Sequence, residues 1–242
     1  MRIPQSKFIE LVNYLQEQGY DPIYISLYGS QNYNLENANS DYDFKVFVKP
    51  KLKDLFKNVM TSRNIEYKGG IVEIRDFRYI HHQMACMNPN FLELFVTENY
   101  WCNSYYAQHM GWIRNLVDDL IQDRFVQFTK AVYGAMCDVY EKIQTPTGHN
   151  PKKLYTLVRL YYMFKSAEYG QKVSVIPTPD VQKILKSCKE GQHNDFEALE
   201  IAKYYLELIK AERAEIVKDP FISEKSIDRL EEILYDLFQI AV

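Results

Sequence analysis

The sequence contains few cysteines and no long apolar run. Four cysteines are scattered along 242 residues without a Cys-x-x-Cys pair: Cys86, Cys102, Cys137 and Cys188. This spacing excludes a disulfide-rich scaffold and predicts reduced thiols. No segment approaches the roughly 18 apolar residues that a membrane-spanning helix needs, and the first residues lack the apolar stretch of a signal peptide. We therefore expect a cytoplasmic protein that does not enter a membrane.

An excess of one charge and a Walker-type phosphate loop are also missing. The net charge is -3, from 29 basic and 32 acidic residues. The chain as a whole does not attract a polyanion, so any contact with RNA or DNA requires a local patch. The absence of a Gly-Lys-Ser or Gly-Lys-Thr turn argues against a P-loop enzyme. A hydrophobic content of 47% is nevertheless sufficient for a buried core.

What the sequence does contain is a strand that ends in a Gly-Ser turn. Residues 23–28 form an apolar, β-branched and aromatic run that stops at Gly29, as a short buried strand does at a turn. Gly29 allows the backbone to approach a ligand closely, and Ser30 adds a hydroxyl and an N–H group. The turn therefore suits a phosphate group.

Two aspartates follow at alternate positions of a second predicted strand, residues 42–48. Alternation along the strand places Asp41, Asp43 and Lys45 on one face and the apolar side chains on the other. Neighbouring carboxylates repel each other unless a cation lies between them. Mg²⁺ accepts one or two protein carboxylates together with water and substrate phosphates, and a pair of such ions supports phosphoryl or nucleotidyl transfer. The pattern thus predicts a metal site beside the Gly-Ser turn.

A third carboxylate lies in the next predicted strand, residues 69–75. There Glu73 is on the face opposite the apolar residues. If this strand pairs with the second one, we expect three carboxylates to converge. The other interpretation is that Glu73 only pairs with Arg75 or Lys45 on a solvent-facing surface.

Two other enzyme classes also use an Asp-x-Asp motif. A haloacid dehalogenase needs an apolar strand that ends at the first aspartate, whereas the residues before Asp41 are polar. A glycosyltransferase would bind a metal–nucleotide unit but gives no reason for the upstream Gly-Ser turn. Both are therefore less favoured than a metal site that supports phosphoryl or nucleotidyl transfer.

Together these residues resemble the DNA polymerase β-type nucleotidyltransferase superfamily. Its signature is Gly-Ser, a spacer, Asp-x-Asp on one strand and a third acid on a neighbouring strand. Gly29-Ser30, Asp41-Tyr42-Asp43 and Glu73 match it in order and spacing. The resemblance implies that Asp41, Asp43 and Glu73 are catalytic and bind Mg²⁺ or Mn²⁺, and that Gly29 and Ser30 bind the nucleotide.

Three further stretches resemble a branch of uncharacterised bacterial and phage predicted nucleotidyltransferases. They are residues 88–94, residues 150–160 and the pair Glu190-Gly191. In the second stretch, Lys152, Thr156 and Arg159 share one helical face. Lys152 and Arg159 suit a triphosphate, although a solvated basic edge is the alternative.

The chain departs from this branch at two positions. Asn34 stands where the branch usually has a glycine, and Asn tolerates the left-handed conformation, so the turn can be retained. Thr156 stands where the branch tends to have a histidine, which removes any role that the histidine would have.

The sequence therefore predicts an α+β fold, with a small mixed-sheet catalytic core carrying helices on one face. We expect the core to span residues 1–100 and a helical domain residues 101–242, with a break near residues 144–151. The predicted activity is transfer of a nucleoside monophosphate from an NTP, by default ATP, to a hydroxyl of an RNA end, a protein or a small molecule. A catalytically silent nucleotide-binding module is the alternative.

Overall fold

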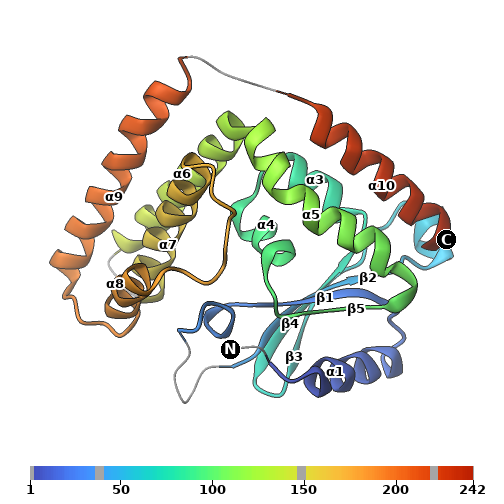
Figure 1. Cartoon of the computed structure of the whole chain (residues 1–242). Helices are drawn as coiled ribbons and strands as arrows, with labels where there is room; N and C mark the ends of the chain where they lie inside the picture. The colour runs from blue at the N-terminus through green and yellow to red at the C-terminus, as the bar shows by residue number, and fades with distance from the viewer. Residues whose placement is uncertain (1–2, 36–40, 146–150, 219–222, 242) are drawn as a thin grey trace. The chain divides into compact units, whose positions relative to one another are not determined.

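The computed structural model describes residues 3–35, 41–145, 151–218 and 223–241 (Figure 1). It divides into two compact units. The first is built from segments within residues 1–85, 90–117 and 225–242, and the second from residues 86–89 and 118–224. The first unit contains the sheet and the Gly-Ser turn, so it is the unit that positions the predicted catalytic residues.

The first unit contains five strands and a set of short and long helices. Its elements in chain order are α1 (Gln5–Glu17), β1 (Pro22–Tyr28), η1 (Ser30–Tyr33), β2 (Asp43–Val48), α2 (Leu52–Phe56), β3 (Ser62–Tyr67), β4 (Gly70–Asp76), α3 (Tyr79–Ala85), α4 (Pro89–Val96), β5 (Tyr100–Cys102), η2 (Ser104–Tyr106), the first part of α5 (Ala107–Asp123) and α10 (Lys225–Ala241). The α+β fold class predicted from the sequence is confirmed.

The sheet has the strand order β3-β4-β2-β1-β5. β2 and β4 are parallel neighbours, whereas the other pairs are antiparallel. The register places Tyr28 opposite Asp43 and Lys45 opposite Glu73. The expected pairing of the second and third predicted strands is therefore confirmed. The sequence does not predict the two edge strands, β3 and β5, because β3 is mostly polar and β5 has only three residues.

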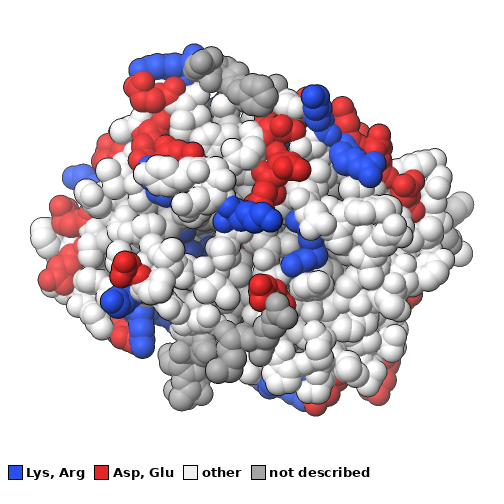
Figure 2. Space-filling view, viewed as in Figure 1, with Lys and Arg blue, Asp and Glu red and all other residues white. Residues whose placement is uncertain are grey.

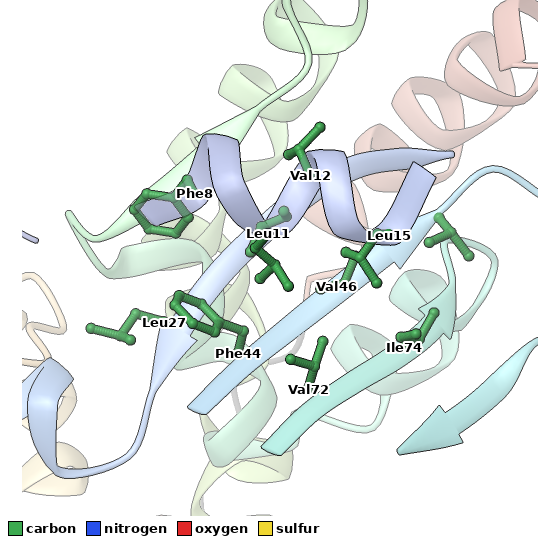
Figure 3. Close-up of a cluster of buried hydrophobic side chains, with 11 residues drawn as sticks. Phe8, Leu11, Val12, Leu15, Leu27, Phe44, Val46, Val72 and Ile74 are labelled. Atoms are coloured by element: carbon green, nitrogen blue, oxygen red, sulfur yellow. The ribbon is translucent and has the colours of Figure 1, made fainter. Parts of the chain in front are cut away.

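Helix α1 covers one face of the sheet (Figure 3). Its apolar side chains recur with helical spacing, and Leu11 and Leu15 are completely buried. They pack against alternate residues of the strands, among them Phe44 and Val46 on β2 and Val72 on β4. Because successive strand residues face opposite sides, this contact directs Asp43 and Lys45 away from the core.

The opposite face is covered in part by helix α4. On β1 and β2, Tyr24 and Phe47 stack on Phe95 with ring centroids 5.4 and 5.8 Å apart. Phe91 meets Phe47 edge-on at 5.5 Å. Helices therefore lie on both faces, which differs from the expected arrangement on one face. The second face of β2 is apolar under α4 at Phe47 and polar towards Asp43.

Helix α10 comes from the end of the chain but belongs to the sheet-containing unit. It packs against α3, and Phe238 lies 6.1 Å from Phe77 between ring centroids (Figure 1). The compact units therefore differ from the predicted division into residues 1–100 and 101–242. The difference arises because a long-range apolar contact with Phe77, which leaves no local pattern, places the last helix in the sheet-containing unit.

The second unit is helical in its described part. It contains the end of α5 followed by α6 (Phe125–Ile143), α7 (Pro151–Glu168), α8 (Pro179–Lys189) and α9 (Asp195–Ile216). The sequence predicts one helical run over residues 105–143, but the run is broken at Arg124, whose φ of -121° and ψ of 36° are not helical. Within the predicted break at 144–151, residues 146–150 lie outside the described part of the chain.

None of the described helices is long and apolar enough to cross a membrane. On the surface, lysines and arginines lie among aspartates and glutamates (Figure 2). The four cysteines are all free thiols, as expected from their spacing.

The free thiols should differ strongly in reactivity. Burial raises the pKa of the Cys188 thiol to about 11 and that of Cys102 to about 12, whereas Cys86 is exposed. Because the thiolate is the nucleophile, we expect iodoacetamide at pH 8 to alkylate Cys86 at least about tenfold faster than Cys188 or Cys102. Peptide mass spectrometry of the native protein measures the three rates. Equally fast alkylation of Cys188 before unfolding would contradict this burial.

Candidate active site

The Gly-Ser turn follows β1 and is continued by the short helix η1. Gly29 has a φ of 76°, a region that favours glycine. The turn is closed by two backbone hydrogen bonds, from Asn32 N to Gly29 O at 3.0 Å and from Leu35 N to Ser30 O at 3.1 Å. Asn34 adopts the left-handed conformation with a φ of 54°. The expectation that Asn34 can adopt the left-handed conformation in this turn is therefore confirmed.

Asp43 lies directly against this turn. A Cβ atom added to Gly29 would be 3.1 Å from Asp43 Oδ2. The other oxygen, Oδ1, accepts a hydrogen bond of 3.0 Å from the backbone N–H of Ile71 on β4. The structure thus places one carboxylate oxygen beside the backbone that the sequence predicts to hold phosphate, with the carboxylate anchored on the neighbouring strand.

Asp41 lies just before β2, beside the turn that joins β3 to β4. Its Oδ1 would be 3.3 Å from a Cβ atom added to Gly69, and its side chain is exposed. Tyr42, between the two aspartates, packs with the core on the other side. Asp41 and Asp43 therefore occupy the same side of the chain, as strand alternation predicts.

Glu73 is engaged by two cations and a hydroxyl. Its Oε2 lies 3.1 Å from Lys45 Nζ and 3.2 Å from Arg75 Nη2. Its Oε1 accepts a hydrogen bond of 3.1 Å from the Tyr28 hydroxyl. All three partners come from neighbouring positions of the sheet, so the register itself brings them together. The pairing of Glu73 with Lys45 and Arg75, one of the two alternatives from the sequence, is present.

Tyr28 lies next to both carboxylates of the sheet face. Burial, and after it the negative charges of Glu73 and Asp43, raise the pKa of the Tyr28 hydroxyl well above its usual range. The hydroxyl therefore remains a neutral donor at neutral pH. Lys45 Nζ also lies over the Tyr28 ring, 5.7 Å from its centroid. The sequence does not mark Tyr28 as a residue of the site, because an aromatic ring is also typical of an ordinary buried strand.

The donor set can be compared with the needs of a metal ion. Within the described residues, no three His, Cys, Asp or Glu side chains form a group that could hold a metal ion. Glu73 lies in ion pairs with Lys45 and Arg75, and its part in a metal site with Asp41 and Asp43 stays a prediction. Asp43 faces the Gly29 turn and Asp41 faces Gly69. These two carboxylates fit Mg²⁺, which commonly binds through one or two carboxylates plus substrate phosphates.

The two basic residues predicted to bind phosphate lie on α7, in the second unit. Lys152 is exposed, whereas Arg159 is buried with 8% of its surface accessible. The Thr156 hydroxyl donates to the Lys152 carbonyl at 2.7 Å, a bond within the helix. Arg159 is therefore not part of a solvated basic edge. That Lys152 and Arg159 bind the same nucleotide as the aspartates stays a prediction.

Comparisons with known proteins include a distant structural likeness. No protein-family model matches the chain, and no curated protein matches its sequence. Among solved structures, the chain is similar to a nucleotidyltransferase-like protein from Exiguobacterium sibiricum 255-15, with 10% sequence identity and a TM-score of 0.34. The match covers 96% of this chain and 78% of that chain. At this level of similarity, the function has to be inferred from the chain's own residues.

Proposed function

We propose that the protein is a metal-dependent nucleotidyltransferase, which moves a nucleoside monophosphate from an NTP to a hydroxyl acceptor and releases pyrophosphate. The observation that carries this proposal is the contact between Asp43 and the Gly29 turn. A carboxylate oxygen adjacent to a phosphate-binding backbone is the arrangement that a metal–triphosphate complex requires. ATP is the default donor, and Mg²⁺ or Mn²⁺ is the expected metal.

The residues of the site have distinct roles in this reaction. Ser30 and the backbone of its turn hold the terminal phosphates, while Asp41 and Asp43 hold the metal. When bound, the metal ions supply positive charge to the transferring phosphoryl group. The acceptor oxygen forms a bond to the α-phosphorus as the bond to the pyrophosphate oxygen breaks. The acceptor proton passes to the carboxylate of Asp43 or Glu73. Positioning and charge neutralisation supply most of the rate.

Glu73 is the third carboxylate of the proposed metal site. The ammonium group of Lys45 competes with a metal ion for this carboxylate. Replacing Lys45 with methionine keeps the length of the side chain but removes a positive charge 3.1 Å from Glu73. We expect Lys45→Met to strengthen Mn²⁺ binding by about threefold to tenfold, since a nearby like charge no longer repels the ion. Electron paramagnetic resonance of Mn²⁺ during a titration measures the affinity.

Two further variants separate the roles of Glu73. Lys53→Met on α2 removes an exposed lysine and serves as the charge control. In the double variant Lys45→Met, Glu73→Gln the gain in affinity should disappear if Glu73 is a metal ligand. A gain that persists in the double variant would assign Glu73 to its ion pairs alone and leave the metal to Asp41 and Asp43.

The test of the proposed reaction is transfer of label from α-phosphate-labelled ATP, GTP, CTP and UTP. Each is incubated with Mg²⁺, Mn²⁺ or chelator, together with RNA, protein and metabolite fractions of a cell extract. We expect metal-dependent label in one fraction with the wild type and none with a variant that carries both Asp41→Asn and Asp43→Asn. Label that persists with chelator or in the double variant would overturn the proposal.

Because Glu73 is engaged in ion pairs, a second candidate function is nucleotide binding without transfer. A module that binds a nucleotide without transferring it needs the turn and the two aspartates but no third carboxylate. Metal-dependent nucleotide binding without label in any fraction would favour this module. Transfer to any acceptor would exclude it.

A further inference from the structure

A group of buried polar side chains connects the Gly-Ser turn to helix α4 and to the residues between α4 and strand β5. Of the nine polar or charged residues that are buried in the described part of the chain, four belong to this group. They are Asn32, Glu93, Thr97 and Asn99. Together with the buried Tyr33 we call them the turn anchor. Burying polar groups costs free energy unless they are hydrogen-bonded. Four buried polar residues in one place therefore indicate a specific structural role.

The bonds of the turn anchor run from η1 to α4 and the residues that follow it. The Tyr33 hydroxyl donates to Glu93 Oε2 at 2.6 Å, and both side chains are buried. The Thr97 hydroxyl donates to Asn32 Oδ1, which also accepts from Asn99 Nδ2 at 3.4 Å. Two consecutive residues of η1 are thus fastened to α4 and its C-terminal end by separate hydrogen bonds.

Asn99 extends the same anchor to the strand that precedes the turn. Its backbone N–H donates to Thr97 Oγ1 at 3.0 Å, and its carbonyl accepts from Leu27 N at 2.9 Å. Leu27 is two residues before Gly29 on β1. The chain is therefore held on both sides of Gly29-Ser30, by Asn99 before the turn and by the partners of Asn32 and Tyr33 after it.

We propose that Glu93 and Thr97 are positioning residues, which set the place of the Gly29-Ser30 turn relative to Asp43. The inference rests on the proposed function, since it assigns the anchor to the binding of the nucleotide phosphates. Gly29 is within contact distance of Asp43, so a shift of the turn changes the space between the phosphate-binding backbone and the carboxylate. Buried, fully bonded polar groups hold one conformation where apolar contacts tolerate several.

The first arm of the test measures the turn without a nucleotide. In the variants Tyr33→Phe and Thr97→Val, hydrogen exchange of the peptide that covers residues 29–35 should be about tenfold faster, because one anchor bond is lost in each. Thr129→Val is the matched control, because Thr129 is also fully buried but its hydroxyl bonds only to the Phe125 carbonyl of its own helix among the contacts described. An unchanged exchange rate of this peptide in both variants would overturn the proposal that the turn anchor holds the turn in place.

The second arm measures what the anchor does for the ligand. Titration of Mg²⁺ and ATP should give about tenfold weaker binding for Tyr33→Phe and Thr97→Val, with Thr129→Val at the wild-type value. In the transfer assay, KM should rise more than kcat falls. A lower Tm in all three variants with unchanged ATP affinity would assign the anchor to stability alone and overturn the positioning role. If the wild type binds no nucleotide, the proposed function fails, and the exchange data still decide whether the anchor holds the turn.

Discussion

Asp43→Asn should reduce nucleotidyl transfer by roughly a thousandfold, since a lost metal-binding charge removes several kcal/mol of transition-state stabilisation. The variant should nevertheless fold. Asparagine retains a carbonyl oxygen that can accept the N–H of Ile71, the bond of 3.0 Å that ties this side chain to β4. We therefore expect the free energy of unfolding to change by less than about 1 kcal/mol. Single-turnover transfer from labelled ATP, with urea unfolding of the same samples, measures both quantities.

The matched control is Glu66→Gln, which removes an exposed carboxylate from the edge strand β3 of the same sheet. It changes the net charge by the same amount but should leave the transfer rate within about twofold, because the charge of an exposed side chain is screened by solvent and salt. Activity of Asp43→Asn within tenfold of the wild type would mean that this aspartate does not hold a catalytic metal. Equal losses in the two variants would point to net charge instead.

Gly70→Ala should destabilise the first unit by about 3 kcal/mol, because a side chain has no room at this position. A Cβ atom on Gly70 would lie 2.1 Å from the carbonyl oxygen of Tyr42 and 2.8 Å from its carbonyl carbon. These are backbone atoms of the segment that carries Asp41 and Asp43, so relief of the clash has to separate the two chains. The substitution should therefore also abolish most of the transfer activity.

Thermal unfolding tests this expectation, with a decrease in Tm of roughly 6 to 12 °C for a chain of this size. Gly111→Ala in helix α5 is the matched control, because a Cβ atom there meets no atom within 4 Å. Alanine in a helix is favoured over glycine by about 1 kcal/mol, so this control should be neutral or slightly stabilising. A Gly70→Ala protein with wild-type Tm would show that the approach of the two segments is not as close as described.

The strands of the site could be predicted because each carries its own local pattern. β1 is an apolar run that ends at Gly29, and β2 alternates between apolar and charged residues. The edge strands β3 and β5 could not be found in the same way. β3 has one polar face and only Ile65 and Tyr67 packed against the core on the other, and β5 is very short. Both are strands because of the neighbours with which they pair.

The candidate site was likewise only partly readable from the sequence. The Gly-Ser turn and the two aspartates are defined by residue type and spacing, and the contact of Asp43 with Gly29 agrees with that interpretation. The partners of Glu73 were left open, since Lys45 and Arg75 fit either role. Tyr28 reaches Glu73 across β2, and the register of three strands decides that contact.

The sequence by itself thus determined which segments form the central strands, which face of β2 is buried and that Asp43 lies beside the Gly-Ser turn. These features depend on the periodicity of side chains along one element and on the conformational preferences of single residues such as Asn34. Tertiary structure alone decided the ion pairs of Glu73, the turn anchor and the packing of α10 against Phe77 in the sheet-containing unit. Their partners are separated by many residues along the chain, so the contacts form only when the packing of the sheet and helices brings them together.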